Sequence, residues 1–275
     1  MATRARTQDN GGDNTCSHLL FEEAARLIPE DHNVIYTTRN QLRKQMRQIM
    51  KSIDQAEEKE TVRLLVKGTS QQAIDDSIAT LPFRGSLRVW LENNASSPCA
   101  IITFLPGLPH EVTVDTLQRE IWHKVSMIPG HDHRSIRNVG SCRYEVPGRR
   151  SKEGDAGLRC RTRVGDEWPN VMIEVGYSEP LRLLRFDAQW WLLNSGGRTR
   201  LVIIALVNQN PNSLHLETWE QVPNPNRRTR NSPPTVPFAT NKIDVDSAGT
   251  HPSATDITFS TADLAGIATD IFADF

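Results

Sequence analysis

The chain has 275 residues, of which 37% are hydrophobic and 24% are charged, and its formal net charge is −1. This composition is that of an ordinary soluble protein, and the near-zero charge gives no global signal for nucleic acid. No run of about 18 apolar residues predicts a membrane span, and residues 1–15 lack the apolar core of a secretory signal. The four cysteines form no Cys-x-x-Cys pair, so we expect no zinc site and an intracellular location, cytoplasmic or nuclear.

The first third of the chain is predicted to carry no part of the central fold. Residues 1–15 are polar with two adjacent glycines and are interpreted as a disordered lead. Residues 16–95 are predicted to form a helical extension, although Leu87 to Leu91 alternate as in a strand. The clearest helix covers Thr38–Glu60, where apolar residues recur at helical spacing. These residues are Leu42, Met46, Ile49 and Ile53.

The opposite side of this helix is strongly basic. It carries Arg39, Arg43, Lys44, Arg47 and Lys51. We interpret this side as a solvated face, with a phosphate-facing surface as the alternative.

Between residues 96 and 222, strand and helix patterns alternate, which predicts an α/β domain. Helices are expected at 110–125 and 181–195, and strands at 100–104, 136–146, 155–163, 171–175, 201–207 and 214–219. The strand–helix–strand run from Pro169 to Val207 predicts a parallel strand pair covered by the helix. Residues 223–255 are rich in Pro, Asn, Thr and Ser and are predicted to be a flexible linker. Residues 256–275 regain apolar character and are expected to dock on the core.

A local excess of positive charge lies between Arg134 and Arg163, with nine Lys or Arg and three Asp or Glu. A solvent-exposed hairpin and a phosphate-binding surface are both consistent with it. On the second interpretation the partner is DNA. The residues that would contact it are Arg143, Arg149, Arg150, Arg159 and Arg161.

Two carboxylates are the candidates for chemistry. Asp155 opens one predicted strand, and Glu174 lies in the middle of the next, apolar strand, where an unpaired charge is costly. Adjacent strands lie about 5 Å apart, so both side chains are expected to reach one hard cation, Mg²⁺ or Mn²⁺, which activates water. Glu111, beside the core stripe of its helix, is a candidate third ligand. The alternative roles are a turn residue for Asp155 and an ion pair between Glu174 and Arg159 or Arg161.

The order of these elements resembles a known superfamily. The segments Lys152-Glu-Gly-Asp155-Ala and Pro169-Asn-Val-Met-Ile-Glu174-Val-Gly176-Tyr-Ser178 resemble the PD-(D/E)XK nucleases, most of all the putative restriction-endonuclease-like branch and its versions in filamentous fungi. The resemblance covers roughly residues 98–220, including the Pro-Gly…His-Glu helix start at 106–111. It implies a restriction-endonuclease-like core of helix, three antiparallel strands, helix and strand, preceded here by the helical extension.

The resemblance also implies roles for individual residues. Asp155 and Glu174 match the family's catalytic acidic ligands, whereas Gly176 stands where the family's lysine lies, two residues after the glutamate. The roughly matching place on the following helix is Asp187, so Lys152, Arg182 or Arg185 would have to replace the lysine.

Two functions follow from these assignments. We expect a metal-dependent, phosphodiesterase-like endonuclease that is weak or inactive. The alternative is a non-catalytic nuclease-fold protein that binds nucleic acid or a protein partner. We also expect Gly176→Lys to return an ammonium to the face of Glu174.

Overall fold

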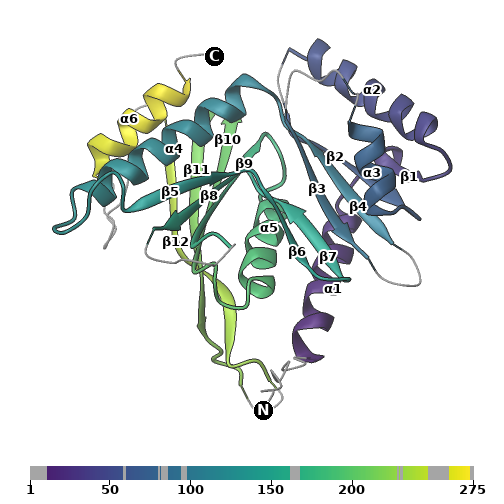
Figure 1. The fold of residues 1–275 in the computed structure, drawn as a ribbon. Coiled ribbons are helices and arrows are strands. Elements are labelled where there is room, and N and C mark those ends of the chain that lie inside the picture. Colours follow the sequence, from purple (N-terminus) through teal and green to yellow (C-terminus); the bar gives the residue numbers. More distant parts are fainter. Residues whose placement is uncertain are drawn as a thin grey trace.

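The computed structural model describes residues 11–57, 60–79, 81, 86–93, 98–161, 168–227, 229, 232–246 and 260–272. These residues form a mixed α/β structure with two six-stranded sheets and helices between and outside them (Figure 1). None of the helices in this part of the chain combines the length and the apolar character needed to cross a membrane.

The first sheet, sheet A, is built largely from the N-terminal third of the chain. Its strands, in spatial order, are β1 (Asn33–Ile35), β2 (Val62–Lys67), β4 (Cys99–Phe104), β3 (Leu87–Glu92), β7 (Arg150–Glu153) and β6 (Arg143–Val146). Helices α2 (Arg39–Gln55) and α3 (Gln71–Ile78) cover its outer face, and α1 (Gly11–Arg26) lies on the inner side. A short 3-10 helix (Glu30–His32) precedes β1.

Helix α2 forms where the apolar spacing predicts it. The Thr38 hydroxyl caps its N-terminus by accepting a hydrogen bond from the Gln41 N–H. Its apolar face is buried against sheet A, as predicted. The buried residues are Leu42, Met46, Ile49, Met50 and Ile53.

The second sheet, sheet B, contains the predicted crossover. Its strands, in spatial order, are β12 (Thr235–Asp246), β11 (Asn212–Pro223), β10 (Leu201–Gln209), β9 (Val171–Tyr177), β8 (Ala156–Cys160) and β5 (Ile136–Gly140). β9 and β10 are parallel and are connected by α5 (Leu181–Asn194), as the crossover pattern predicts. Helices α4 (Leu108–Ser126) and α6 (Thr261–Phe272) cover the outer face.

Helix α5 lies in the layer between the two sheets (Figure 1). Trp190 and Trp191 of this helix are fully buried, and Trp191 contacts Tyr144 of β6 edge to face. The two sheets are also joined directly, because Thr61 and Tyr177 exchange hydrogen bonds. This middle layer is where residues of both sheets meet.

Several predicted boundaries are wrong. The segment 16–95 is not a helical extension only, because β1, β2 and β3 lie within it and form half of sheet A. Of the predicted disordered lead, residues 11–15 belong to α1, and residues 1–10 lie outside the described residues. The predicted strand 136–146 is two strands, β5 and β6, which belong to different sheets.

The segment 223–255 contains a strand where a linker is expected. β12 pairs antiparallel with β11 along its whole length and forms the edge of sheet B. Pro237 is compatible with this place, because an edge strand tolerates a residue without an N–H. In the predicted docking segment, α6 packs against α4 and sheet B through Leu264, Ile267 and Ile271.

Candidate functional site

The candidate site lies where the chain crosses from sheet A to sheet B. Lys152 is on β7, opposite Trp90 of β3, and Asp155 directly precedes β8. Because Ala156 pairs with Ile173, Asp155 enters the sheet beside Glu174, as expected from their consecutive strands. Gly154 makes this crossing possible, since a Cβ there would lie 2.6 Å from Met172 Sδ and 2.8 Å from a Trp191 ring carbon.

Lys152 connects a strand of sheet B to helix α5. Its Nζ lies 3.3 Å from Glu174 Oε1 and 3.0 Å from Asp187 Oδ1. Glu174 also accepts a hydrogen bond from the indole N–H of Trp191. The expected ion pair between Glu174 and Arg159 or Arg161 is therefore replaced by a pair with Lys152.

Arg63 of β2 extends the same chain of ion pairs. Its Nη2 lies 2.7 Å from Asp187 Oδ2, and its Nε donates to Glu179 Oε2 at 3.0 Å. Glu179 fills the space in front of Gly176: a Cβ on Gly176 would collide with the Glu179 carboxylate and would lie 2.8 Å from Leu184 Cδ1. The effect of Gly176→Lys therefore stays a prediction, and a side chain fits there only if Glu179 moves.

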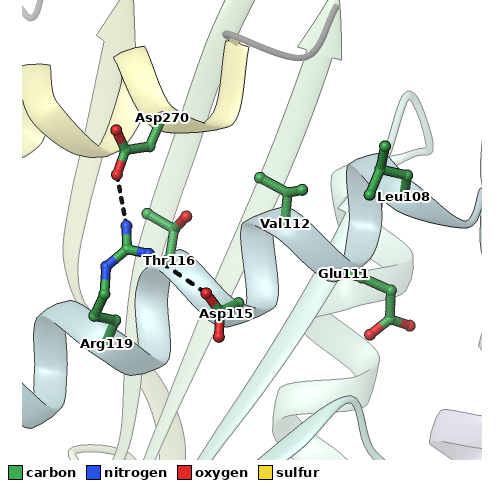
Figure 2. A pocket seen from close by; sticks show the side chains of 7 residues that line it. All are labelled: Leu108, Glu111, Val112, Asp115, Thr116, Arg119 and Asp270. Carbon is green, nitrogen blue, oxygen red and sulfur yellow. Dashed lines mark hydrogen bonds and ion pairs between the residues drawn. The ribbon is translucent and has the colours of Figure 1, made fainter.

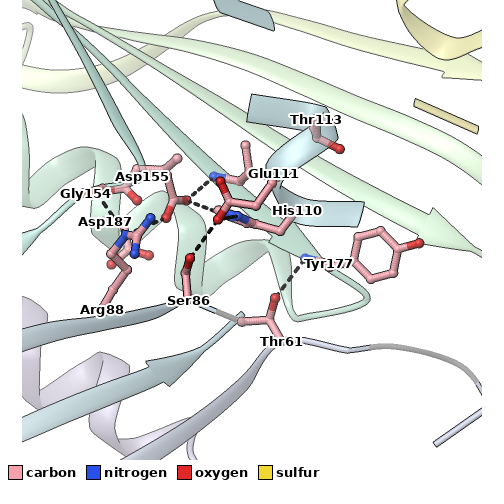
Figure 3. A network of polar contacts seen from close by, with 12 residues as sticks. Thr61, Ser86, Arg88, His110, Glu111, Thr113, Gly154, Asp155, Tyr177 and Asp187 are labelled. Atoms are coloured by element: carbon pink, nitrogen blue, oxygen red, sulfur yellow. Dashed lines mark hydrogen bonds and ion pairs between the residues drawn. The ribbon is translucent and has the colours of Figure 1, made fainter. Parts of the chain in front are cut away.

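Asp155 has a separate set of partners (Figure 3). Arg88 Nε lies 3.1 Å from its Oδ1 and His110 Nε2 lies 3.2 Å from its Oδ2, which also accepts the Val175 N–H at 2.8 Å. Asp155 thus contacts the start of α4, whereas Glu174 faces α5. The two carboxylates are neighbours that each meet different cations.

Glu111 contacts the ring nitrogen Nδ1 of His110, whereas Asp155 contacts Nε2 (Figure 3). Its Oε1 accepts a hydrogen bond from Ser86 Oγ at 2.7 Å and lies 3.6 Å from His110 Nδ1. The side chain is 54% exposed, whereas His110 is fully buried. Glu111 as a metal ligand stays a prediction; in the structure its carboxylate contacts His110, which in turn contacts Asp155.

Together these residues form one group, which we call the charged centre. Its members are the carboxylates Asp155, Glu174, Glu179 and Asp187 and the basic groups Arg63, Arg88, His110 and Lys152. None of these eight side chains is more than 13% exposed. If all eight groups were ionised, four negative charges would face four positive ones.

The pKa values within the charged centre follow from burial and from these pairings. Burial raises the pKa of Glu174 to about 8, against the attraction of Lys152 and with help from the nearby Asp155. Burial likewise raises the pKa of Glu179 to about 7 despite Arg63. For His110 burial acts in the opposite direction, but Asp155 overcomes it and raises the pKa to about 9. Burial would also raise the pKa of Asp155, yet His110 and Arg88 hold it well below its usual range.

The arrangement does not fit a divalent metal ion. Lys152 and Arg88 already lie beside the carboxylate oxygens that Mg²⁺ or Mn²⁺ would need. A further double positive charge would enter a buried group that already holds Arg63, Arg88 and Lys152, which is unfavourable at low dielectric. Over the described ranges, no three His, Cys, Asp or Glu side chains are grouped so that they could hold a metal. We therefore derive no metal-dependent step.

The arginines predicted to contact DNA do not form one surface. Arg150 is buried, with its Nε 3.2 Å from Glu92 Oε2, and Arg143 is paired with Asp75 and Glu153. Arg149 and Arg161 are exposed and Arg159 is half-buried. The hairpin predicted between 136–146 and 155–163 is present in part, because β5 pairs antiparallel with β8 in sheet B. β6 and β7, which lie between them in the chain, pair with each other in sheet A. Arg150 and Arg143 hold the fold together.

A surface groove of about 440 Å³ runs along α4 next to α6 (Figure 2). Arg119 closes it on one side by contacting Asp115 and Asp270. The remaining lining residues are Leu108, Glu111, Val112 and Thr116. Glu111 is the one lining residue that also contacts the charged centre, through His110.

Sequence reasoning missed half of the charged centre. Arg63 lies within the apolar run Val62–Lys67, so the argument made for Glu174, that a charge in a buried strand needs a partner, applied equally to it. Asp187 was considered only as a substitute for a lysine, and it is instead the lysine's partner. Arg88 and His110 carried no local signal, because their role depends on how the two sheets pack.

No protein-family model matches this chain, and searches of the curated proteins and of the solved structures find no significant match.

Proposed function

We propose that this is a nuclease-fold protein of the PD-(D/E)XK kind that acts by binding and does not hydrolyse phosphodiesters. The order of elements supports the fold assignment: α4, β5, β8, β9, α5 and β10 follow one another, with β6 and β7 inserted into sheet A. The pairs β5–β8 and β8–β9 are antiparallel, and β9–β10 is parallel. This order and these pairings support the core of helix, three antiparallel strands, helix and strand that the resemblance implies.

The observation that carries the proposal is the buried charged centre, in which each carboxylate is paired with a basic group of the chain. Phosphodiester cleavage needs a substrate oxygen and a water within reach of the catalytic groups, and a positive group for the developing charge. Asp155, Glu174 and Lys152 are all buried, and each already has an ionic partner from the chain. The carboxylates therefore serve to join the two sheets.

A second function, metal-dependent phosphodiester hydrolysis, is favoured by one specific observation. The Lys152 ammonium lies 3.3 Å from Glu174, beside the acidic pair where the family's lysine would act. Catalysis would require the centre to open and Lys152 to leave Asp187, which would uncover two buried carboxylates. We rank this function second because breaking buried ion pairs costs about 3–5 kcal/mol.

A plasmid-nicking time course with Mg²⁺ or Mn²⁺ distinguishes the two functions. We expect no cleavage by wild type above the level of Glu174→Gln. Glu217→Gln is the matched control, because Glu217 is a buried, ion-paired glutamate of β11 outside the charged centre. Cleavage by wild type and Glu217→Gln that Glu174→Gln and Lys152→Met both abolish would establish the second function and refute the first.

A further inference from the structure

We infer that the exposed side of helix α2 binds the phosphate backbone of a nucleic acid. The inference names a ligand for the proposed binding function and rests on it. Three side chains, which we call the α2 basic face, carry it: Lys44, Arg47 and Lys51. They recur at spacings of three and four residues on one side of the helix. All three are exposed, and none has an ion pair or hydrogen bond with another residue in the described part of the chain.

This absence of partners distinguishes the α2 basic face from many other Lys and Arg side chains of the protein, which are ion-paired. Arg143, Arg150 and Arg185 each hold a carboxylate. On α2 itself, Arg43 is used for structure, because its guanidinium donates to the carbonyl oxygens of Asp76 and Ser77 at the end of α3. The α2 basic face has no such structural use.

The spacing of the α2 basic face suits a regular array of phosphates. Lys44 and Lys51 are seven residues apart, which is roughly 10 Å along a helix that rises about 1.5 Å per residue. The only acidic residue of α2 is Asp54, beyond the basic stretch. Asn40 and Gln48 of α2 are also exposed, and amide side chains commonly hydrogen-bond phosphate and sugar oxygens. A duplex carries one charge per about 1.7 Å of its axis, so several phosphates fall within this length.

A membrane surface is a poorer partner for the same helix. Interfacial helices insert an apolar face among the lipids. The apolar face of α2, with Met46 and Ile49, is buried against sheet A and is not available. An acidic polypeptide has charges of the right sign, and the experiment below separates it from nucleic acid.

The test measures the affinity of the full chain for a fluorescein-labelled duplex of about 20 base pairs as salt is varied. The test variant is Lys44→Gln/Arg47→Gln/Lys51→Gln, which keeps good helix formers. The control variant is Arg182→Gln/Arg200→Gln/Lys242→Gln, which removes the same charge from exposed positions elsewhere. Each lost phosphate contact reduces the log–log salt slope by about 0.9. We expect the test variant to lose roughly 100-fold in affinity at about 0.1 M salt, and the control variant to change by less than about threefold.

Three results would overturn the inference. These are no duplex binding by wild type at low salt, an equal loss in both variants, and competition by polyglutamate as effective per charge as unlabelled duplex. The last result would assign the α2 basic face to an acidic protein. Plasmid nicking by wild type would refute the proposed non-catalytic function without changing these binding results, so the two failures are distinguishable.

Discussion

The charged centre and the α2 basic face both contain lysine and arginine side chains, which are buried in the first region and exposed to solvent in the second. In the charged centre, Lys152 is buried between Glu174 and Asp187, whereas on α2 Lys51 is exposed and unpaired. A buried charge must be matched inside the protein, because desolvation costs several kcal/mol per ion. An exposed charge is hydrated and available to a partner. Burial therefore identifies which charges hold this protein together and which ones can bind.

The largest expected effect comes from removing the lysine of the charged centre. Lys152→Met keeps the length of the side chain but leaves Glu174 and Asp187 without their shared cation. We expect the free energy of unfolding to fall by about 3–5 kcal/mol. Lys51→Met is the matched control on the α2 basic face and is expected to change stability by less than about 0.5 kcal/mol. Equal effects in urea titrations would remove the contrast between the two regions.

The indole that contacts Glu174 is expected to matter nearly as much. Trp191 is fully buried and packs against Tyr144 and Trp168, in addition to donating to Glu174. Trp191→Ala should destabilise the protein by at least about 3 kcal/mol. Trp191→Phe keeps most of the ring contacts and should lose less. A urea midpoint for Trp191→Ala within error of wild type would contradict this packing.

The charged centre also makes stability fall at alkaline pH. The folded-state pKa of Glu174 is raised from 4.5 to about 8, so its contribution is full below pH 4.5 and is lost as the pH rises through 8. His110 acts in the same direction, with its contribution full below pH 6.5 and lost through pH 9.

We therefore expect the free energy of unfolding to fall by several kcal/mol between pH 6 and 9, because each group contributes about 1.4 kcal/mol per pH unit between its unfolded and folded pKa. Glu174→Gln stays neutral at every pH, so this variant should show a shallower decline. Urea unfolding at several pH values measures both. A free energy of unfolding that stays constant from pH 6 to 9 would show that the pKa values of Glu174 and His110 are not raised in the folded protein.

The smallest effect is expected for the α2 basic face. The variant Lys44→Gln/Arg47→Gln/Lys51→Gln removes no contact with another described residue. Its thermal unfolding should match wild type to within about 0.5 kcal/mol. A larger loss would mean that these side chains stabilise α2. A loss of duplex binding by this variant could then result from unfolding and not from the missing charges.

The predictable part of the fold is the part with strong local periodicity. The sequence predicts helix α2 from the helical spacing of Leu42 to Ile53, and it predicts the crossover from β9 through α5 to β10. Both patterns are strong because one buried face dominates each of them. β2 was missed although Val62–Lys67 is an apolar run, and β12 was missed because Pro237 and polar neighbours resemble a linker. The division of 136–146 between two sheets depends on tertiary pairing and has no local signal.

The candidate site was predictable in its acidic half. Glu174 was singled out because a carboxylate in a buried strand needs a partner, and Asp155 because it opens the preceding strand. Their cations come from β3 and β7 of sheet A and from the start of α4. No spacing within residues 96–222 reveals that Arg63 approaches Asp187, because the contact depends on packing one sheet against the other.

The most direct test of the account is whether the charged centre takes up a metal ion. Calorimetric titration of the full chain with Mn²⁺ compares wild type with Glu174→Gln and Asp155→Asn. The account predicts no saturable site that either substitution removes, because Lys152 and Arg88 already lie beside these carboxylates. A stoichiometric Mn²⁺ site in wild type that both variants lose, together with a metal-dependent rise in unfolding temperature, would contradict the claim that the centre is complete without a metal.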